Sequence, residues 1–112
     1  MSLRRVLLLP SIVLSLAVAP PGSVPPDREA AWRENNLGVA LLEQFRFTDG
    51  AKAFERALEK DPTLLAARVN LAIAHLYVPD IPAAKQAAEE ALLHAPDAPQ
   101  PNYVLALIAR SE

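Results

Sequence analysis

The sequence predicts an all-α fold, an α-solenoid made of two antiparallel helix pairs and the first helix of a third pair. Three observations lead to this prediction. Hydrophobic residues make up 52% of the chain and aromatic residues only 5%, and a composition rich in alanine and leucine suits closely packed helices better than strands. The sequence also resembles itself at an offset of 34 residues. Finally, prolines divide it into segments of helix length.

The internal repeat is the strongest of these signals. Residues 31–64 align with residues 65–98 without a gap, and nine of the 34 aligned positions are identical. The matches fall at helical spacing, for example in the segments 36–40 (NLGVA) and 70–74 (NLAIA), and a third copy begins at Pro99. A fixed period in this range indicates stacked units of two helices each.

The N-terminal residues have the layout of a secretory signal peptide. Two arginines precede an apolar run from Val6 to Val18, and residues 17–19 (AVA) have the small-residue form of a cleavage site. The run has 13 residues, fewer than the roughly 20 that span a bilayer as a helix. Because Pro20 hinders the peptidase, we interpret residues 1–19 as either a cleaved signal peptide or a retained N-terminal anchor. In both cases we expect an exported protein, periplasmic or secreted.

A proline-rich linker, residues 20–27, separates this leader from the expected repeat domain, residues 28–112. Proline lacks an amide donor and disfavours helix in the residue before it, so the linker is expected to be extended. Asp27 is a suitable cap for the first helix, which we expect from about Asp27 to Gln44.

The second helix is expected to follow a turn through Phe45–Gly50. Thr48 or Asp49 is its expected cap, and the helix continues to about Lys60. The dipeptide at 61–62 (DP) stops it, because proline cannot continue a helix.

The second unit repeats this plan. A third helix is expected over about Thr63–Tyr77, followed by a turn through Pro79 and Asp80. A fourth helix is expected over about Ile81–His94, because proline in its first turn sacrifices no helix hydrogen bond. A fifth helix, expected over Pro101–Arg110, begins the third unit.

Small residues are expected where the helices of a unit cross. Glycine inside a helix costs roughly 1 kcal/mol relative to alanine, and close helix contact is the expected compensation. We also expect Leu37 and Leu71 to be buried between paired helices. The small residues at the expected crossings are Gly38, Ala57, Ala72 and Ala91.

The period and these residues resemble the tetratricopeptide repeat, whose pattern is W-x2-L-G-x2-Y…A-x3-F…P. The resemblance extends from about Ala31 to Arg110, although the tryptophan position holds Glu34 and Arg68. It implies stacked helix pairs and a role in binding other proteins rather than in catalysis. The pattern is met by Leu37, Gly38, Phe54 and Pro62 in the first unit and by Leu71, Ala84 and Pro96 in the second.

In this family, the first helices of successive units line a concave groove that holds a peptide or a partner helix. The corresponding residues here are mostly neutral or apolar, so we expect no clamp for a terminal carboxylate. Asn36 and Asn70 occupy equivalent positions and leave two interpretations open. They form a ladder that holds an extended peptide backbone, or each bonds to a neighbouring turn or to water. By the resemblance, the groove residues are Asn35, Asn36, Val39, Leu42, Glu43, Asn70, Ile73, Leu76, Tyr77, Tyr103 and Leu107.

The composition argues against several other functions. The net charge is −2, and −4 without the two leader arginines, which argues against nucleic-acid binding. The chain has no cysteine and two isolated histidines, so it offers no cluster of metal ligands. We expect no catalytic residue and no cofactor, because the serines lie in the leader, the linker and the last two residues and the chain has no phosphate-binding loop.

The fifth helix is apolar on nearly every side through residues 103–109 (YVLALIA). Such a helix is normally buried, so we expect Leu105, Leu107 and Ile108 to need a cover at the C-terminal edge. The cover is either further sequence or a second copy of the chain.

The leading functional hypothesis is an exported scaffold or adaptor that binds a protein segment in its groove. It contacts a membrane only through a retained leader. The alternative is the N-terminal repeat segment of a longer secreted protein whose catalytic or ligand-binding domain lies downstream.

Overall fold

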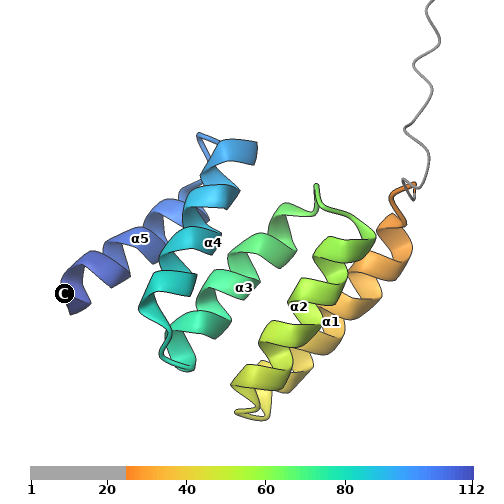
Figure 1. Ribbon diagram of the computed structural model, residues 1–112, viewed down its shortest axis with the longest axis horizontal. Helices are drawn as coiled ribbons and strands as arrows, with labels where there is room; N and C mark the ends of the chain where they lie inside the picture. The colour runs from red at the N-terminus through yellow and green to blue at the C-terminus, as the bar shows by residue number, and fades with distance from the viewer. Residues whose placement is uncertain (1–24) are drawn as a thin grey trace, which may run out of the picture.

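The computed structural model describes residues 25–112, which form five helices joined by short turns (Figure 1). Each helix packs against the next, and no strand occurs in this part of the chain. The expected all-α solenoid is therefore confirmed. The expected leader and the first five linker residues, 20–24, lie outside the described residues. The helices are α1 (Arg28–Glu43), α2 (Phe47–Lys60), α3 (Leu65–Tyr77), α4 (Ile81–His94) and α5 (Pro99–Ser111).

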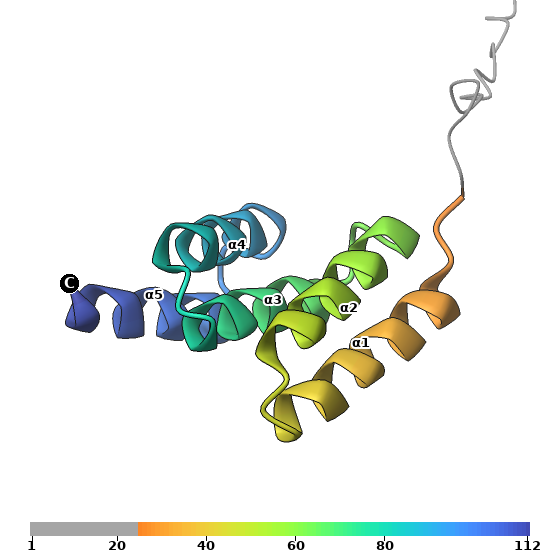
Figure 2. The same cartoon turned by 60° about the horizontal axis from the view of Figure 1, so that its bottom comes forward.

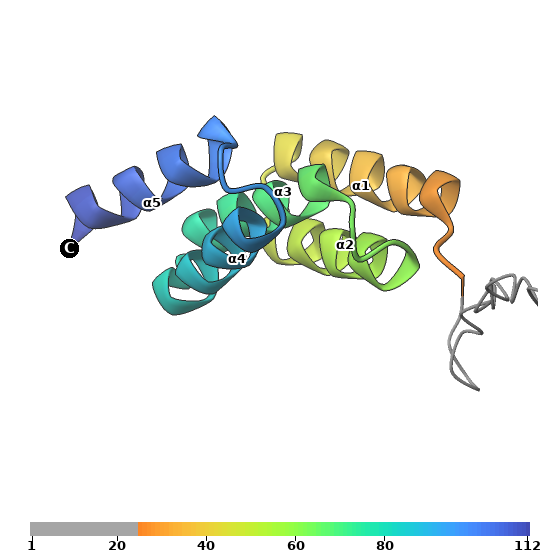
Figure 3. The ribbon, with the colours of Figure 1, turned by 90° about the horizontal axis from the view of Figure 1, so that it is seen from above.

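The helices form two rows. Figure 2 and Figure 3 show α1, α3 and α5 along one side of the array and α2 and α4 along the other. The first helices of successive units also touch, because α1 contacts α3 and α3 contacts α5. They therefore share one surface across all three units. None of the helices described here has the length and hydropathy needed to cross a membrane.

Aspartate side chains cap two of the helices. Oδ1 of Asp27 accepts a hydrogen bond from the backbone N–H of Ala30 at 2.9 Å, and Oδ1 of Asp80 accepts one from Ala83 at 3.1 Å. Each bond satisfies a backbone N–H that has no partner within its helix. The expected cap at Asp27 and the expected bounds of the fourth helix are confirmed.

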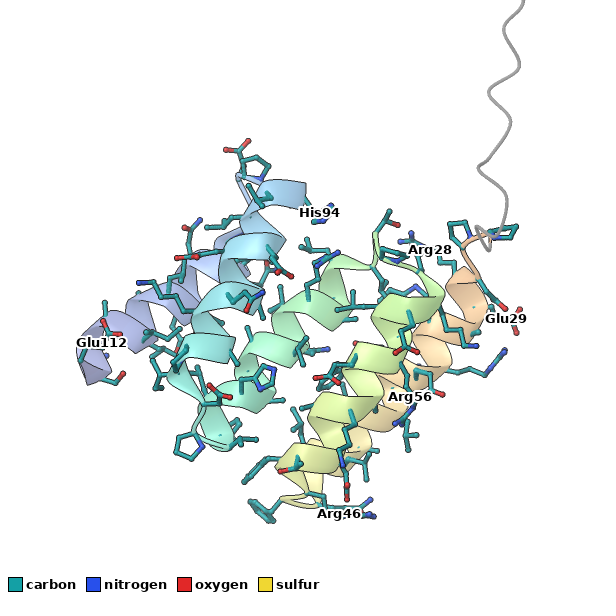
Figure 4. All side chains as sticks on the ribbon, viewed as in Figure 1. Arg28, Glu29, Arg46, Arg56, His94 and Glu112 are labelled. Carbon is teal, nitrogen blue, oxygen red and sulfur yellow. The ribbon has the colours of Figure 1, made fainter. Side chains whose placement is uncertain are left out.

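The expected start of the second helix is wrong. α2 begins at Phe47, directly after Arg46, and not after a cap at Thr48 or Asp49. The turn is short because Phe45 adopts a left-handed backbone conformation with a φ of 60°, which reverses the chain within a few residues. Asp49 lies in the first turn of α2 and pairs with Arg46, whose Nη2 is 2.8 Å from Oδ2. Arg46 lies at this turn in Figure 4.

Two other helix starts differ from expectation by two residues. α3 begins at Leu65 instead of Thr63, and α5 begins at Pro99 instead of Pro101. Oδ1 of Asp61 accepts hydrogen bonds from the backbone N–H of Thr63 at 2.9 Å and from its hydroxyl at 2.6 Å, and these bonds hold Thr63 in a turn before α3. Pro99 starts α5 because the first helical position has no N–H bond to lose.

Asp61 also places a buried carboxylate at the junction of the two units. Its side chain is only 2% exposed, and Nη1 of Arg28 lies 3.5 Å from Oδ2. The two hydrogen bonds from Thr63 and, to a lesser degree, the charge of Arg28 lower the pKa of the Asp61 carboxyl, while burial acts in the opposite direction. The ionised group therefore stabilises the folded state above its ordinary pKa. This contribution is lost as the pH falls through the lowered pKa.

α1 and α2 approach each other closely at two glycines. An ideal Cβ on Gly38 would lie 2.7 Å from Cδ1 and 2.8 Å from Cζ of Phe54, whose side chain is fully buried. An ideal Cβ on Gly50 would lie 3.2 Å from the carbonyl oxygen of Gly38. The expected close contact at Gly38 is therefore confirmed. The equivalents of Gly38 and Phe54 in the second unit are Ala72 and Ala88, which are both buried.

The prediction that Leu37 is buried is wrong, because this side chain is 46% exposed. Its equivalents in the later units show the reason. Leu71, which was also expected to be buried, is only half-buried. It packs against the cluster that includes Ala88 of α4 in its own unit and against the cluster that includes Phe54 of α2, and Leu105 packs against the Ala88 cluster. For each of these leucines, one such cluster contains residues of the second helix of the preceding unit. Within residues 25–112, α1 has no preceding unit to contact.

The C-terminal edge is less exposed than expected. Val104 and Ile108 are buried in a cluster with residues of α4, so the expected exposure of Ile108 is wrong. Leu105 and Leu107 are half-buried, and Leu105 packs on the same cluster. The cover expected at this edge, whether further sequence or a second copy, stays a prediction.

We predict that Gly38→Ala destabilises the protein, although it removes a glycine from a helix interior. The gain in helix propensity is about 1 kcal/mol. Forcing a methyl group against the buried Phe54 ring costs about 1–3 kcal/mol. The melting temperature, followed by circular dichroism at 222 nm, should therefore fall.

The same substitution in a Phe54→Leu background is the matched control. Leucine removes the ring atoms that crowd Gly38, so Gly38→Ala should be neutral or stabilising there. The side chains of the double variant at positions 38 and 54 are also closer in size to Ala72 and Ala88, the equivalent pair of the second unit. An equal effect of Gly38→Ala in both backgrounds would show that residues 38 and 54 do not couple.

Candidate functional site

A shallow groove crosses α1, α3 and α5, on the row of first helices seen in Figure 2. It consists of four adjoining cavities of about 300–380 Å³ each. Neighbouring cavities share lining residues, since Asn70 belongs to three of them and Ile73 also belongs to three. The cavities therefore form one continuous surface with α3 at its centre.

The structure brings most of the expected groove residues together. Two of the expected residues, Asn35 and Asn36, line none of the four cavities. The function of the others in binding a partner stays a prediction. Those that line the groove are Val39, Leu42 and Glu43 from α1, Asn70, Ile73, Leu76 and Tyr77 from α3, and Tyr103 and Leu107 from α5.

Asn35 and Asn70 form a hydrogen bond between units beneath the groove. Nδ2 of Asn70 donates to Oδ1 of Asn35 at 3.0 Å, and Asn35 is only 3% exposed. Asn35 therefore orients Asn70 from below. An amide has two N–H groups and a carbonyl oxygen, and this bond uses one N–H of Asn70. Asn70 thus supplies the central polar group of the groove, while Asn36 is exposed outside the four cavities.

Three aromatic rings form the α1 end of the groove, and we call Phe45, Phe47 and Tyr77 the aromatic corner. The rings of Phe47 and Tyr77 stack, with centroids 4.8 Å apart and an interplanar angle of 13°. Phe45 meets Phe47 edge to face, at 6.2 Å and 89°. Both phenylalanines lie in the segment that was expected to be a turn, so their place in the groove was not predicted. The available signal is their presence among the polar residues that otherwise fill this turn.

The end of α1 exposes the Phe45 ring. The N–H of Phe45 donates to the carbonyl of Leu42 at 3.0 Å, and the N–H of Arg46 donates to the carbonyl of Leu41 at 2.9 Å. This pair of bonds is a Schellman motif, in which the left-handed position usually holds glycine. Here Phe45 holds it, and the side chain is 80% exposed. A left-handed conformation costs a non-glycine residue about 1–2 kcal/mol.

The groove is nearly neutral apart from one acid. Glu43, the last residue of α1, is the single charged residue that lines these four cavities. None of the ion pairs found among the described residues includes Glu43. Arg46 instead bonds Asp49 through Nε at 3.1 Å and Nη2 at 2.8 Å. Across residues 25–112, no three acidic, histidine or cysteine side chains gather into a potential metal site.

Comparison with known proteins gives a partial similarity. No protein-family model matches the sequence. A 56-residue stretch, 50% of the chain, is 36% identical to the peroxisomal targeting signal receptor of Eremothecium gossypii. The match spans 10% of that receptor. It is compatible with a helical repeat and suggests a role in protein interaction without identifying a partner.

We predict that Phe45→Gly is as stable as the wild type or more stable by up to about 1 kcal/mol, because glycine adopts the left-handed conformation freely. Phe45→Ala is the matched control, since it loses the same ring and keeps the strained conformation. Denaturant unfolding measured by circular dichroism should rank Phe45→Gly above Phe45→Ala. The opposite order would contradict the strain assigned to this position.

Proposed function

We propose that the chain is an exported adaptor of the tetratricopeptide type, which binds a segment of another protein in the groove and catalyses no reaction. The carrying observation is the continuous surface across three first helices, with large apolar side chains left exposed on it. Tyr77 and Tyr103 are 59% and 66% exposed. Contiguous exposed apolar surface marks interaction sites on soluble proteins, and neutral groups at its centre suit a peptide backbone.

The dimensions of the groove support an extended ligand. Packed helices lie about 8–10 Å apart, so the three first helices span about 20 Å between their outer axes. An extended chain advances about 3.3 Å per residue. A segment of about six residues therefore crosses the groove, with its side chains over the apolar cavities and its backbone within reach of Asn70.

The partial similarity to a receptor also supports this proposal. The name of the Eremothecium gossypii protein describes a receptor for a targeting signal, and a receptor acts by binding. Together with the helix pairs and the family pattern at Leu37, Gly38, Phe54 and Pro62, this similarity supports a tetratricopeptide-type binding module. Export is proposed from the leader alone, because the two arginines and the apolar run Val6–Val18 fit a secretory signal.

We predict that Tyr103→Asp abolishes peptide binding without unfolding the protein. Tyr103 is largely exposed and lines two of the four cavities, so an acid here disturbs the groove and little else. The measurement is enrichment of sequences from a displayed library of random dodecapeptides on the immobilised full chain. Circular dichroism verifies that helical content is unchanged.

Leu93→Asp is the matched control for this experiment. Leu93 lies on α4, is 83% exposed and lines none of the four groove cavities. The Leu93→Asp variant should enrich the same peptides as the wild type. Equal enrichment by Tyr103→Asp and the wild type would contradict binding in the groove.

Export has its own test. Residues 1–26 fused to a phosphatase that is active only outside the cytoplasm should give an active reporter. A matched fusion with Leu14→Arg interrupts the apolar run and should be inactive. An inactive phosphatase in the unaltered fusion would refute export. N-terminal sequencing of the mature protein then distinguishes cleavage near Ala19 from a retained anchor.

A further inference from the structure

We infer that the α1 end of the groove is a cation site, in which Glu43 and the aromatic corner hold a lysine or arginine side chain carried by an otherwise apolar segment. This inference rests on the proposed binding function of the groove. It goes further by assigning the chemistry of one ligand residue and the place where that residue sits.

The rings provide the first argument. Phe45, Phe47 and Tyr77 line one cavity of about 350 Å³, together with Glu43. Phe47 stacks on Tyr77, and Phe45 stands perpendicular to Phe47. The face of an aromatic ring carries negative charge density and attracts ammonium and guanidinium groups within about 6 Å of its centroid. An aromatic enclosure with one carboxylate fits a cation better than a neutral apolar side chain.

The uncompensated charge provides the second argument. Glu43 is exposed and takes part in none of the ion pairs within the described residues. The nearest cation in sequence, Arg46, is held by Asp49 through two hydrogen bonds. No lysine, arginine or histidine lines this cavity. Arg46 lines an adjoining cavity with the same three rings, but its guanidinium is held there by Asp49. Within the cavity that contains Glu43, a ligand cation therefore meets a carboxylate that is paired in none of these ion pairs.

Two helix ends add to this negative potential. α1 ends at Glu43 and α3 ends at Tyr77, so both carboxyl ends lie at this cavity. The carboxyl end of a helix carries about half a negative charge. The last turn of α1 contains no basic residue, and His75 in the last turn of α3 does not line this cavity. The helix ends and Glu43 thus favour the same sign of ligand charge.

The backbone at Phe45 provides a third argument. The position is left-handed and 80% exposed, where glycine would be more stable and would expose no apolar surface. Strained positions of this kind gather at binding sites, where the strain serves the function. An exposed ring held in this way gains its interactions from a ligand, because the fold gives it few.

The site also limits what the ligand is. A free terminal carboxylate or an acidic side chain at this end would face Glu43 and two helix carboxyl ends, so it is disfavoured. The cavities beyond the aromatic corner are lined by Ile73, Leu76, Tyr103 and Leu107, which suit apolar side chains. The expected ligand is therefore an apolar segment with a basic residue at one end.

A small cation tests the site independently of any peptide. Tetramethylammonium chloride, titrated into the full chain, should shift the ring proton resonances of Phe45, Phe47 and Tyr77 in NMR spectra. Tert-butanol, a neutral molecule of similar size, and sodium chloride at equal ionic strength are the controls. Glu43→Gln should reduce the affinity for tetramethylammonium by about threefold to fivefold. Equal shifts with tert-butanol, or no effect of Glu43→Gln, would overturn the cation site.

A displayed peptide library gives the second measurement. The wild type should enrich apolar peptides with lysine or arginine at a fixed position, and Glu43→Gln should lose the basic preference while keeping the apolar one. Glu89→Gln, an exposed acid of α4 outside the groove, is the matched control and should behave as the wild type. Synthetic peptides with lysine, arginine or norleucine at that position then compare the two cations with a neutral side chain.

The two measurements separate failure of the inference from failure of the proposed function. Enrichment of apolar peptides without a basic preference overturns the cation site and leaves the groove function intact. Tetramethylammonium shifts that depend on Glu43 support the cation site, even where no peptide is enriched. In that case it is the proposed binding of protein segments that is overturned.

Discussion

The contact between Gly38 of α1 and the buried ring of Phe54 in α2 is the constraint on which the rest of the array depends. It permits the close approach of the first helix pair, and the Phe54 cluster is also the surface against which Leu71 of the next unit packs. The second unit reaches a similar approach with a different pair, Ala72 and Ala88. In the first unit a large ring faces a residue without a side chain, and in the second unit two methyl groups face each other. Both pairs fill the space between the two helices. The size of each residue therefore has meaning only together with its partner across the helix pair.

The repeat explains why so much of this fold was visible in the sequence. The 34-residue period and the helix-stopping prolines predict five helices, and α4 has the expected bounds. The failures have local physical causes. The start of α2 depends on a left-handed Phe45, and propensity rules assign that conformation to glycine or asparagine. Leu37 belongs to a repeat position that is half-buried in the later units, yet it lies in the first unit, where no preceding helix covers it within residues 25–112. Periodicity describes the interior of an array and says little about its ends.

The candidate site was predictable to a similar extent and for related reasons. Equivalent positions on the first helices identify most of the groove, because stacking places them on one surface. They do not reveal that Asn35 lies beneath Asn70, since burial depends on the side-chain packing of two units at once. Of the aromatic corner, only Tyr77 was expected in the groove, because Phe45 and Phe47 lie beyond the end of the first helix. Residues at the junction of two helices are missed by a repeat pattern that is defined by helix faces.

The same irregularity gives a direction to the groove. In a perfectly repeating array, a bound segment could shift by one unit and meet the same contacts. The position of Glu43 is taken by Tyr77 in the second unit and by Ser111 in the third, while Phe45 is replaced by Pro79. Glu43 and Phe45 therefore have no counterpart in the second unit, and the cavity at the α5 end is lined by uncharged, mostly apolar residues. A basic residue of a bound segment has one favourable place, so the proposed cation site fixes both the register and the direction of the ligand.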